Sequence, residues 1–226
     1  MPHRLIANRV RELGPTLVGG LLVLAGGLWV FGAVAEEVSE GDTGLDDRLA
    51  NWLHAHATDS LTTFFEAVTK LGNGIVLAGV AALAAYLLAR RRLYADAVLM
   101  VLAYCGAEVL SYGLKLGFKR DRPFFTDPIA TANTYSFPSG HATVSVATYG
   151  ALAFVLARRV RGRARYAILG AAALLVSLIG FSRLYLGVHF LSDVIAGYSA
   201  GIAWVAFCVV VLDLHERLRS RGQTLR

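Results

Sequence analysis

The sequence predicts an all-α integral membrane protein built as a bundle of six transmembrane helices. Its 226 residues are 56% hydrophobic and have a mean hydropathy of +0.55, whereas soluble domains are about half apolar even when glycine is counted. The apolar residues gather in segments long enough to cross a bilayer. Basic residues concentrate in alternate loops between these segments, which is typical of a membrane protein with a fixed orientation.

Six apolar segments account for the predicted spans. The first follows Arg4, Arg9 and Arg11 and ends in Ala33-Val34-Ala35, an arrangement that cleaved signal peptides also have. Its apolar run is longer than a signal peptide needs, so we expect it to be retained as the first helix. All six segments are long enough, or nearly so, and they lie at about 15–35, 73–89, 93–114, 141–157, 166–182 and 190–212.

The segment between the first two spans is acidic and carries apolar residues at helix-like spacing. Its apolar groups include Leu49-Ala50-Asn51-Trp52-Leu53 and Leu61-Thr62-Thr63-Phe64-Phe65. This pattern predicts short amphipathic helices lying at the membrane surface. The chain contains no internal repeat and no linker, so we expect one domain over residues 1–226.

The distribution of Lys and Arg predicts the orientation. With the N-terminus in the cytoplasm, 15 of the 22 basic residues fall on the cytoplasmic side, five of them between residues 158 and 165. The opposite side keeps Arg48, Lys70, Lys115, Lys119, Arg120, Arg122 and Arg183. We therefore expect a multi-pass protein of the inner cell membrane with both termini in the cytoplasm. Because the net charge of +6 comes from short loops, it does not indicate a nucleic-acid partner.

Three short polar clusters lie at the ends of apolar segments on the extracytoplasmic side. They are Lys115…Arg122-Pro123, Pro138-Ser139-Gly140-His141 and Ser182-Arg183…His189…Asp193. A bilayer tolerates such groups where they serve a function or reach water. Their common side of the membrane predicts that they converge on one site.

The cations and small residues of these clusters suit a phosphate group. Phosphoryl transfer spreads charge over the equatorial oxygens, so catalysis needs several fixed donors around one point. Lys115, Arg122 and Arg183 would supply positive charge, Ser139 a hydroxyl hydrogen bond, and Gly140 a closely approaching backbone. A helix that begins after Pro138 would add free N–H groups at its N-terminus.

The two histidines would divide the bond-making and proton-transfer steps. His189 and Asp193 are four residues apart, so the carboxylate can hold one ring nitrogen protonated and leave the other free to attack phosphorus. His141 would then protonate the leaving oxygen as a general acid. We expect no metal and no cofactor, because these histidines and carboxylates lack metal-ligand groupings and have cations as neighbours.

Taken together, the three clusters resemble, in order and spacing, the signature of the type 2 phosphatidic acid phosphatase family. The resemblance implies a membrane lipid phosphatase whose fold is shared with vanadium haloperoxidases. It also implies a phosphohistidine intermediate, with His189 as nucleophile, Asp193 as its orienting partner and His141 as acid. Implied substrates are undecaprenyl pyrophosphate, phosphatidylglycerol phosphate and phosphatidic acid, among which the sequence does not choose.

Other side chains and other functions were weighed against this interpretation. We expect Lys119 and Arg120 to face solvent or lipid headgroups, and Glu108 to partner a neighbouring basic or hydroxyl group. One alternative function is a lipid phosphotransferase that uses the same site. Another is a small transporter, but a transporter would carry polar groups at mid-depth, whereas here they collect at one face.

Overall fold

The computed structural model describes residues 14–41 and 43–224, and within them it contains eight α-helices and no β-strand. Arg4, Arg9, Arg11 and Arg226, which contribute to the charge asymmetry, lie outside the described residues. The helices are α2 (Pro15–Glu40), α3 (Gly44–Ala55), α4 (Asp59–Lys70), α5 (Gly74–Arg90), α6 (Tyr94–Phe118), α7 (Gly140–Ala157), α8 (Arg163–Tyr185) and α9 (Leu191–Thr224).

Five of the described helices, α2, α6, α7, α8 and α9, are each long and apolar enough to cross a membrane. The sixth expected span corresponds to α5, which has 17 residues and passes the same test only together with α4. The two helices are bent by 43° at a short break. The predicted all-α membrane bundle is therefore confirmed, with the second span preceded by a kinked extension.

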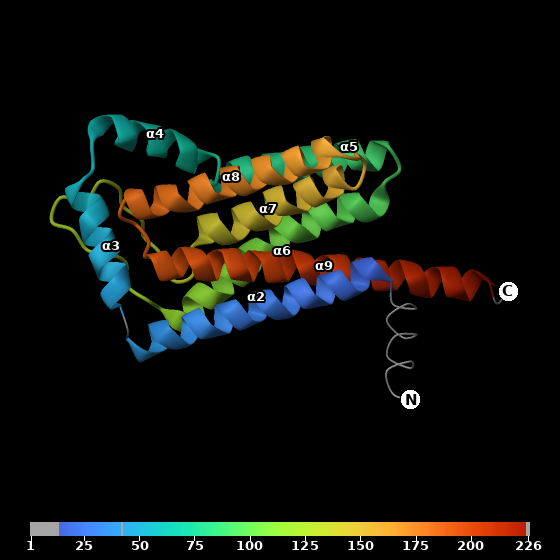
Figure 1. Cartoon of the computed structure of the whole chain (residues 1–226), viewed down its shortest axis with the longest axis horizontal. Helices are drawn as coiled ribbons and strands as arrows, with labels where there is room; N and C mark the ends of the chain where they lie inside the picture. Colours follow the sequence, from blue (N-terminus) through green and yellow to red (C-terminus); the bar gives the residue numbers. More distant parts are fainter. Residues whose placement is uncertain (1–13, 42, 225–226) are drawn as a thin grey trace.

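The acidic segment forms the two helices expected between the first and second spans. Figure 1 shows α3 lying across one end of the bundle, while α2 begins and α9 ends towards the opposite end. Leu53 of α3 and Phe65 of α4 are buried against the end of α8, where the Phe65 and Tyr185 rings are 4.7 Å apart between centroids. This packing attaches the α3–α4 segment to the bundle.

The break between α4 and α5 has its backbone groups satisfied by side chains. Asn73 caps α5 by accepting a hydrogen bond from the N–H of Ile75. Two tyrosines complete the pairing, because Tyr149 donates to the carbonyl of Leu71 and Tyr104 to that of Gly74. Irregular backbone in an apolar medium needs such partners.

Glu108 of α6 lies beside this break. Its carboxylate is close to Gly74, at the N-terminus of α5, and to the side chain of Tyr104. A carboxylate is favourable at a helix N-terminus. Glu108 thus has a hydroxyl-bearing neighbour, as expected, but the hydroxyl of Tyr104 donates to the carbonyl of Gly74.

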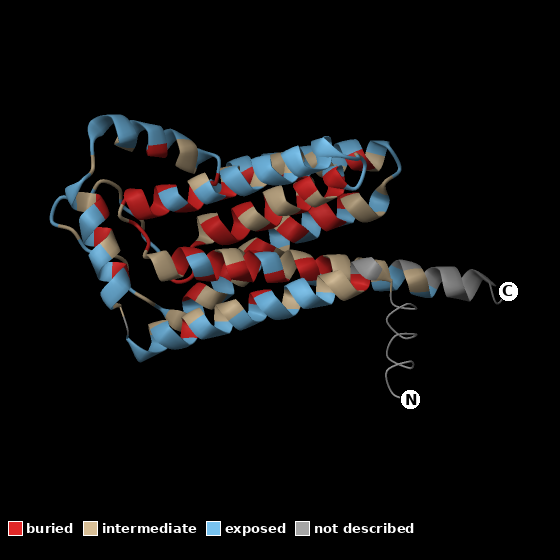
Figure 2. Cartoon of the chain, in the orientation of Figure 1, coloured by how far each residue is buried: buried red, intermediate tan, exposed pale blue. Residues whose placement is uncertain are grey.

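Helix α7 is the centre of the bundle. It packs against α5, α6, α8 and α9, and most of its residues are buried, whereas the outer faces of α2, α5 and α8 are largely exposed (Figure 2). Those outer faces are apolar, with exposed Trp29, Ile75 and Leu174 among them. An apolar exposed surface around a polar-ended bundle is what contact with lipid requires.

Two glycines of α9 allow it to approach α7 closely. Gly197 and Gly201 form a G-x-x-x-G pair, which brings helix backbones together in membranes. A Cβ atom at Gly197 would lie 2.8 Å from the carbonyl oxygen of Ser139, and one at Gly201 would lie 2.5 Å from that of Thr143. Both obstacles are backbone atoms, so neither can be relieved by a side-chain rotation.

We predict that Gly201→Ala lowers the stability of the protein by about 1–3 kcal/mol, because the added methyl group forces α7 and α9 apart. The measurement is the midpoint of thermal unfolding in detergent. Gly150→Ala on α7 is the matched control, since a Cβ atom there meets nothing within 4 Å. Equal midpoints for Gly201→Ala and the control would contradict the close packing.

Candidate active site

The expected site residues all lie at the end of the bundle that α3 crosses. Lys115 lies in the last turn of α6, and Arg183 lies in the last turn of α8. Gly140 and His141 lie in the first turn of α7, directly after Ser139, and Asp193 lies in the first turn of α9. Arg122 and His189 lie in the loops after α6 and before α9. Segments far apart in sequence thus deliver polar groups to one place.

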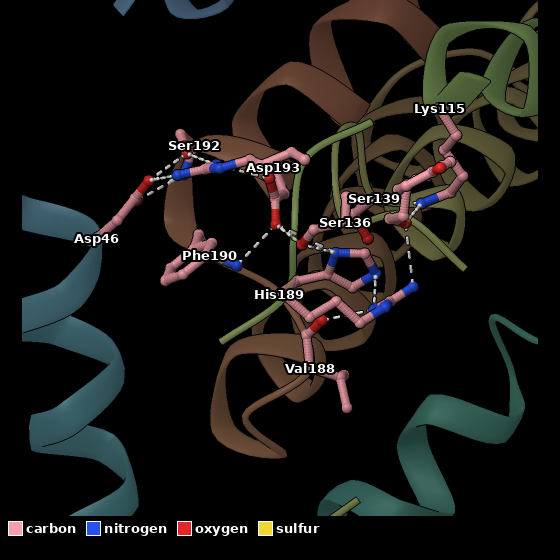
Figure 3. A network of polar contacts seen from close by, with 12 residues as sticks. Asp46, Lys115, Ser136, Ser139, Val188, His189, Phe190, Ser192 and Asp193 are labelled. Atoms are coloured by element: carbon pink, nitrogen blue, oxygen red, sulfur yellow. Dashed lines mark hydrogen bonds and ion pairs between the residues drawn. The ribbon is translucent and has the colours of Figure 1, made fainter. Parts of the chain in front are cut away.

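His189 and Asp193 form a buried pair (Figure 3). The ring Nδ1 of His189 is 3.3 Å from Oδ2 of Asp193. Because a carboxylate only accepts, Nδ1 carries the proton. The same oxygen accepts from the N–H of Phe190 at 2.8 Å and from the hydroxyl of Ser136. His189 itself lies just before α9, which begins at Leu191, so the pair spans the start of this helix.

The other ring nitrogen of His189 faces Arg122. Nη1 of Arg122 lies 3.2 Å from Nε2, and because a guanidinium only donates, Nε2 is the unprotonated nitrogen. Arg122 is held in place by the carbonyls of Thr134 and Val188 at 2.6 and 2.5 Å. The partners of both nitrogens therefore select the tautomer that a nucleophile attacking through Nε2 requires.

Burial and nearby cations keep His189 neutral. Burial lowers the pKa of His189 to about 3; Asp193 acts in the opposite direction, and Arg122 and Lys115 lower the pKa further. Burial also lowers the pKa of Arg122, while the charge of Asp193 raises it. Since His189 is 3% exposed, an unprotonated imidazole is its favoured form at neutral pH.

The cations around the pair are only partly satisfied by protein groups. Lys115 donates to the carbonyls of Tyr135 and Ser136 at 2.5 and 3.2 Å. Arg183 donates through Nη1 to the hydroxyl of Thr69 at 2.7 Å. Within the described residues, Nε of Arg183 and Oγ of Ser139 are buried without a partner. A buried unpaired donor requires an explanation, and a phosphate oxygen can accept from both groups.

The start of α7 supplies the second histidine. Ser139 precedes the helix, and its side chain makes no capping hydrogen bond within the part of the chain described, so the N–H groups of the first turn can meet an anion. His141 lies in that turn beside Gly72, where a Cβ atom would come within 3.0 Å of its ring. The electrostatic neighbours of His141 are Arg183, His189, Arg122 and Lys115.

One expectation about this loop was wrong. Arg120 does not face solvent or headgroups: its side chain is 10% exposed and bonds to Asp46, Ser192 and Asp193. The cause is Lys119, which ends α6 in the left-handed conformation, remains exposed as expected, and turns the chain so that Arg120 points inwards.

Asp46, Ser136 and Ser192 are further residues of this network that sequence reasoning missed. A signal existed for Asp46, because it shares the buried face of α3 with Ala50 and Leu53 at positions i, i+4 and i+7. A charged residue on an otherwise apolar helical face indicates a buried partner. No comparable signal marks the two serines.

The positive charge of the site comes from side chains. Among residues 14–41 and 43–224, no group of three or more His, Cys, Asp or Glu side chains could hold a metal ion. Lys115, Arg122 and Arg183 are the cations whose charges act on His141.

The family of the chain follows from a match to a family model. The model of the PAP2 superfamily matches residues 96–217, more than half of the chain and all three polar clusters. The chain belongs to this superfamily. The expected family is thereby confirmed.

Two curated proteins of this kind are similar in sequence. Phosphatidylglycerophosphatase B of Bacillus subtilis is 37% identical over 112 residues, which cover 47% of this chain and 53%, about half, of that protein. An undecaprenyl-diphosphatase of Sulfolobus acidocaldarius is 29% identical over 192 residues, covering 83% of this chain and 87% of that protein. Both relatives are phosphatases, in agreement with the expected class of enzyme.

Two solved structures share the PAP2 fold. A transmembrane PAP2-type phosphatidylglycerolphosphate phosphatase from Bacillus subtilis superposes with a TM-score of 0.71 at 25% identity, covering 87% of this chain and 96% of that one. LpxE of Aquifex aeolicus gives a TM-score of 0.57 at 26% identity, covering 75% and 94%. These likenesses support the membrane-bundle fold over most of the chain.

Proposed function

We propose that this PAP2 protein hydrolyses a lipid phosphate or lipid pyrophosphate through a phosphohistidine intermediate. The observation that carries the proposal is the His189 ring, whose Nδ1 is held by Asp193 while Nε2 faces the guanidinium of Arg122. Such a ring is an oriented nucleophile directed at a place where an anion is stabilised. The apolar exterior of the bundle supports a lipid as substrate, its tail remaining in the bilayer.

In the first step, Nε2 of His189 attacks phosphorus and the bond from phosphorus to the leaving oxygen breaks. Arg122, Lys115 and Arg183 stabilise the charge on the equatorial oxygens. His141 gives its proton to the leaving oxygen. A bound phosphate brings negative charge among these cations, which favours the protonated form of His141 when it is needed.

In the second step, water attacks the phosphohistidine. His141, now neutral, takes a proton from the water, the bond between phosphorus and Nε2 breaks, and inorganic phosphate leaves. Asp193 keeps His189 in the same tautomer throughout, so the ring is ready for another cycle. Ser139 and the first-turn N–H groups of α7 would hold the phosphate oxygens.

The proposed substrate class follows the names of the relatives. One acts on phosphatidylglycerophosphate and another on undecaprenyl diphosphate by name. We propose these two lipids and phosphatidic acid as candidate substrates. The decisive experiment is release of inorganic phosphate by the purified protein from each of the three.

We also propose that the site faces away from the cytoplasm in the inner cell membrane. The five arginines between residues 158 and 165 lie at the α7–α8 connection, which is at the end of these helices opposite to His141 and Arg183. Loops rich in Arg remain in the cytoplasm. The opposite end then meets the outer leaflet.

We predict that His189→Ala abolishes both phosphate release and the labelled phosphoenzyme, since the variant lacks the attacking nitrogen. Acid-quenched protein after incubation with radiolabelled substrate measures the intermediate. His56→Ala is the matched control, because the ring of this exposed histidine contacts Trp52, by a hydrogen bond to its carbonyl and by stacking on its ring. Near wild-type turnover by His189→Ala would reject the mechanism.

We predict a different behaviour for His141→Ala. Loss of a general acid costs about 100- to 10,000-fold in rate, and the loss should shrink for a substrate whose leaving group needs no proton. The measurement compares an alkyl phosphate with an aryl phosphate of low leaving-group pKa. A loss of the same size for both substrates would argue against His141 as the acid.

We predict opposite labelling of cysteines placed at the two ends of the bundle. In a background in which Cys105 and Cys208 are replaced by alanine, Thr131→Cys should react with a membrane-impermeant thiol reagent in intact cells. Arg161→Cys should react only after lysis. Both positions are exposed, so access depends on the membrane alone. The reverse pattern would put the site in the cytoplasm.

A further inference from the structure

A chain of alternating charges connects α3 to the His189–Asp193 pair (Figure 3). Arg120 lies at its centre, with Nη1 2.7 Å from Oδ1 of Asp193 and Nη2 2.8 Å from Oδ2 of Asp46. Ser192 bonds to both Arg120 and Asp46. Its hydroxyl accepts a hydrogen bond from Nη1 of Arg120 at 2.7 Å, and its N–H donates to Asp46 at 3.0 Å. The hydroxyl of Ser192 donates in turn to Oδ2 of Asp46.

The chain is buried over its whole length. The side chains of Arg120, Asp46 and Asp193 are 10%, 7% and 0% exposed, and the guanidinium of Arg120 also lies 4.4 Å from the centre of the Phe190 ring. Burying three charges costs desolvation free energy that their attraction only partly offsets. Stability alone is therefore a weak reason for such a network, which makes a functional role worth testing.

Asp193 is the point where this network meets the catalytic groups. Its Oδ2 accepts hydrogen bonds from His189, Ser136 and the N–H of Phe190, and its Oδ1 accepts one from Arg120. Arg120 therefore fixes the plane of the carboxylate from the side opposite to the histidine. Its positive charge also attracts the negative charge of the same carboxylate that bonds to the His189 ring.

We propose that Arg120 and Asp46 are positioning residues that set the orientation and the effective charge of Asp193, and through it the basicity of His189. The proposal rests on the proposed role of His189. The positive charge of Arg120 partly neutralises the carboxylate of Asp193 and so lowers the proton affinity of His189. The negative charge of Asp46 partly neutralises Arg120 and so reduces this effect. The surface helix α3 thus supplies one charge of the active site.

The proton affinity of His189 is the property that reports this role. Asp193 from α9, Arg122 from the loop after α6 and Lys115 from α6 face it, with His141 of α7 and Arg183 of α8 beyond. None of these five residues is substituted in the variants described below. A change can therefore be assigned to Arg120 or Asp46.

The test is a ¹⁵N NMR titration of the His189 imidazole in detergent micelles, which needs no turnover. Arg120→Gln removes a positive charge beside Asp193, so the pKa of His189 should rise by about 0.5–1 unit. Asp46→Asn removes the negative charge that offsets Arg120, so the pKa of His189 should fall below the wild-type value. The double variant should return towards the wild type, because its net charge change is zero.

Turnover gives a second readout. Because the guanidinium of Arg120 is held by Asp46, Ser192 and Asp193 and is proposed to act through Asp193, Arg120→Gln should lower kcat by about tenfold or more and leave KM nearly unchanged. Arg120→Lys keeps the charge and should leave the His189 titration in place. Asp47→Asn is the matched control, since this exposed neighbour on α3 bonds to Thr43.

The outcomes separate the possibilities. An unchanged His189 titration in folded Arg120→Gln, or equal upward shifts in both single variants, would overturn the proposal and leave a structural role only. If Arg120→Gln does not fold, Asp46→Asn and Arg120→Lys still test the sign of the shift and the dependence on charge. If the wild type releases no phosphate, the proposed function fails, whereas the NMR titration still decides the link from Arg120 to His189.

Discussion

Hydrocarbon offers no hydrogen-bond partner to a polar group, and this constraint determines where every charged side chain of the site lies. The spans are apolar through most of their length, so Lys115, Arg183 and Asp193 occur in terminal turns. There each finds a carbonyl, a hydroxyl or an opposite charge. The active site is thus the meeting point of helix ends, and the bundle needs only to bring those ends together.

The close contact of α7 with α9 is what brings the two histidines together. Gly197 and Gly201 let the backbones approach, and the N–H of Ser139 donates to the carbonyl of Asp193 at 2.9 Å. This hydrogen bond ties the start of one helix to the first turn of the other. The bend between α4 and α5 contributes in another way, because Gly72 leaves room for the ring of His141.

The parts of the protein that could be predicted from the sequence are those encoded locally. Six apolar runs predicted the spans, and short motifs such as Pro138-Ser139-Gly140-His141 predicted which helix ends carry polar groups. Arg120 could not be predicted, because its inward direction depends on the left-handed backbone of Lys119 and on Asp46, which is 74 residues away. Periodicity describes one helix at a time, whereas this contact joins a loop to a different helix.

The hydrogen bond from Ser139 to Asp193 has a mechanical consequence. Helices in a membrane bundle shift against one another by thermal motion. His141 follows Ser139 by two residues and His189 is bonded to Asp193, so both rings move with the joint that this bond makes. The spacing of the two imidazole rings is therefore tied to this joint, whereas helices outside it can shift without changing that spacing.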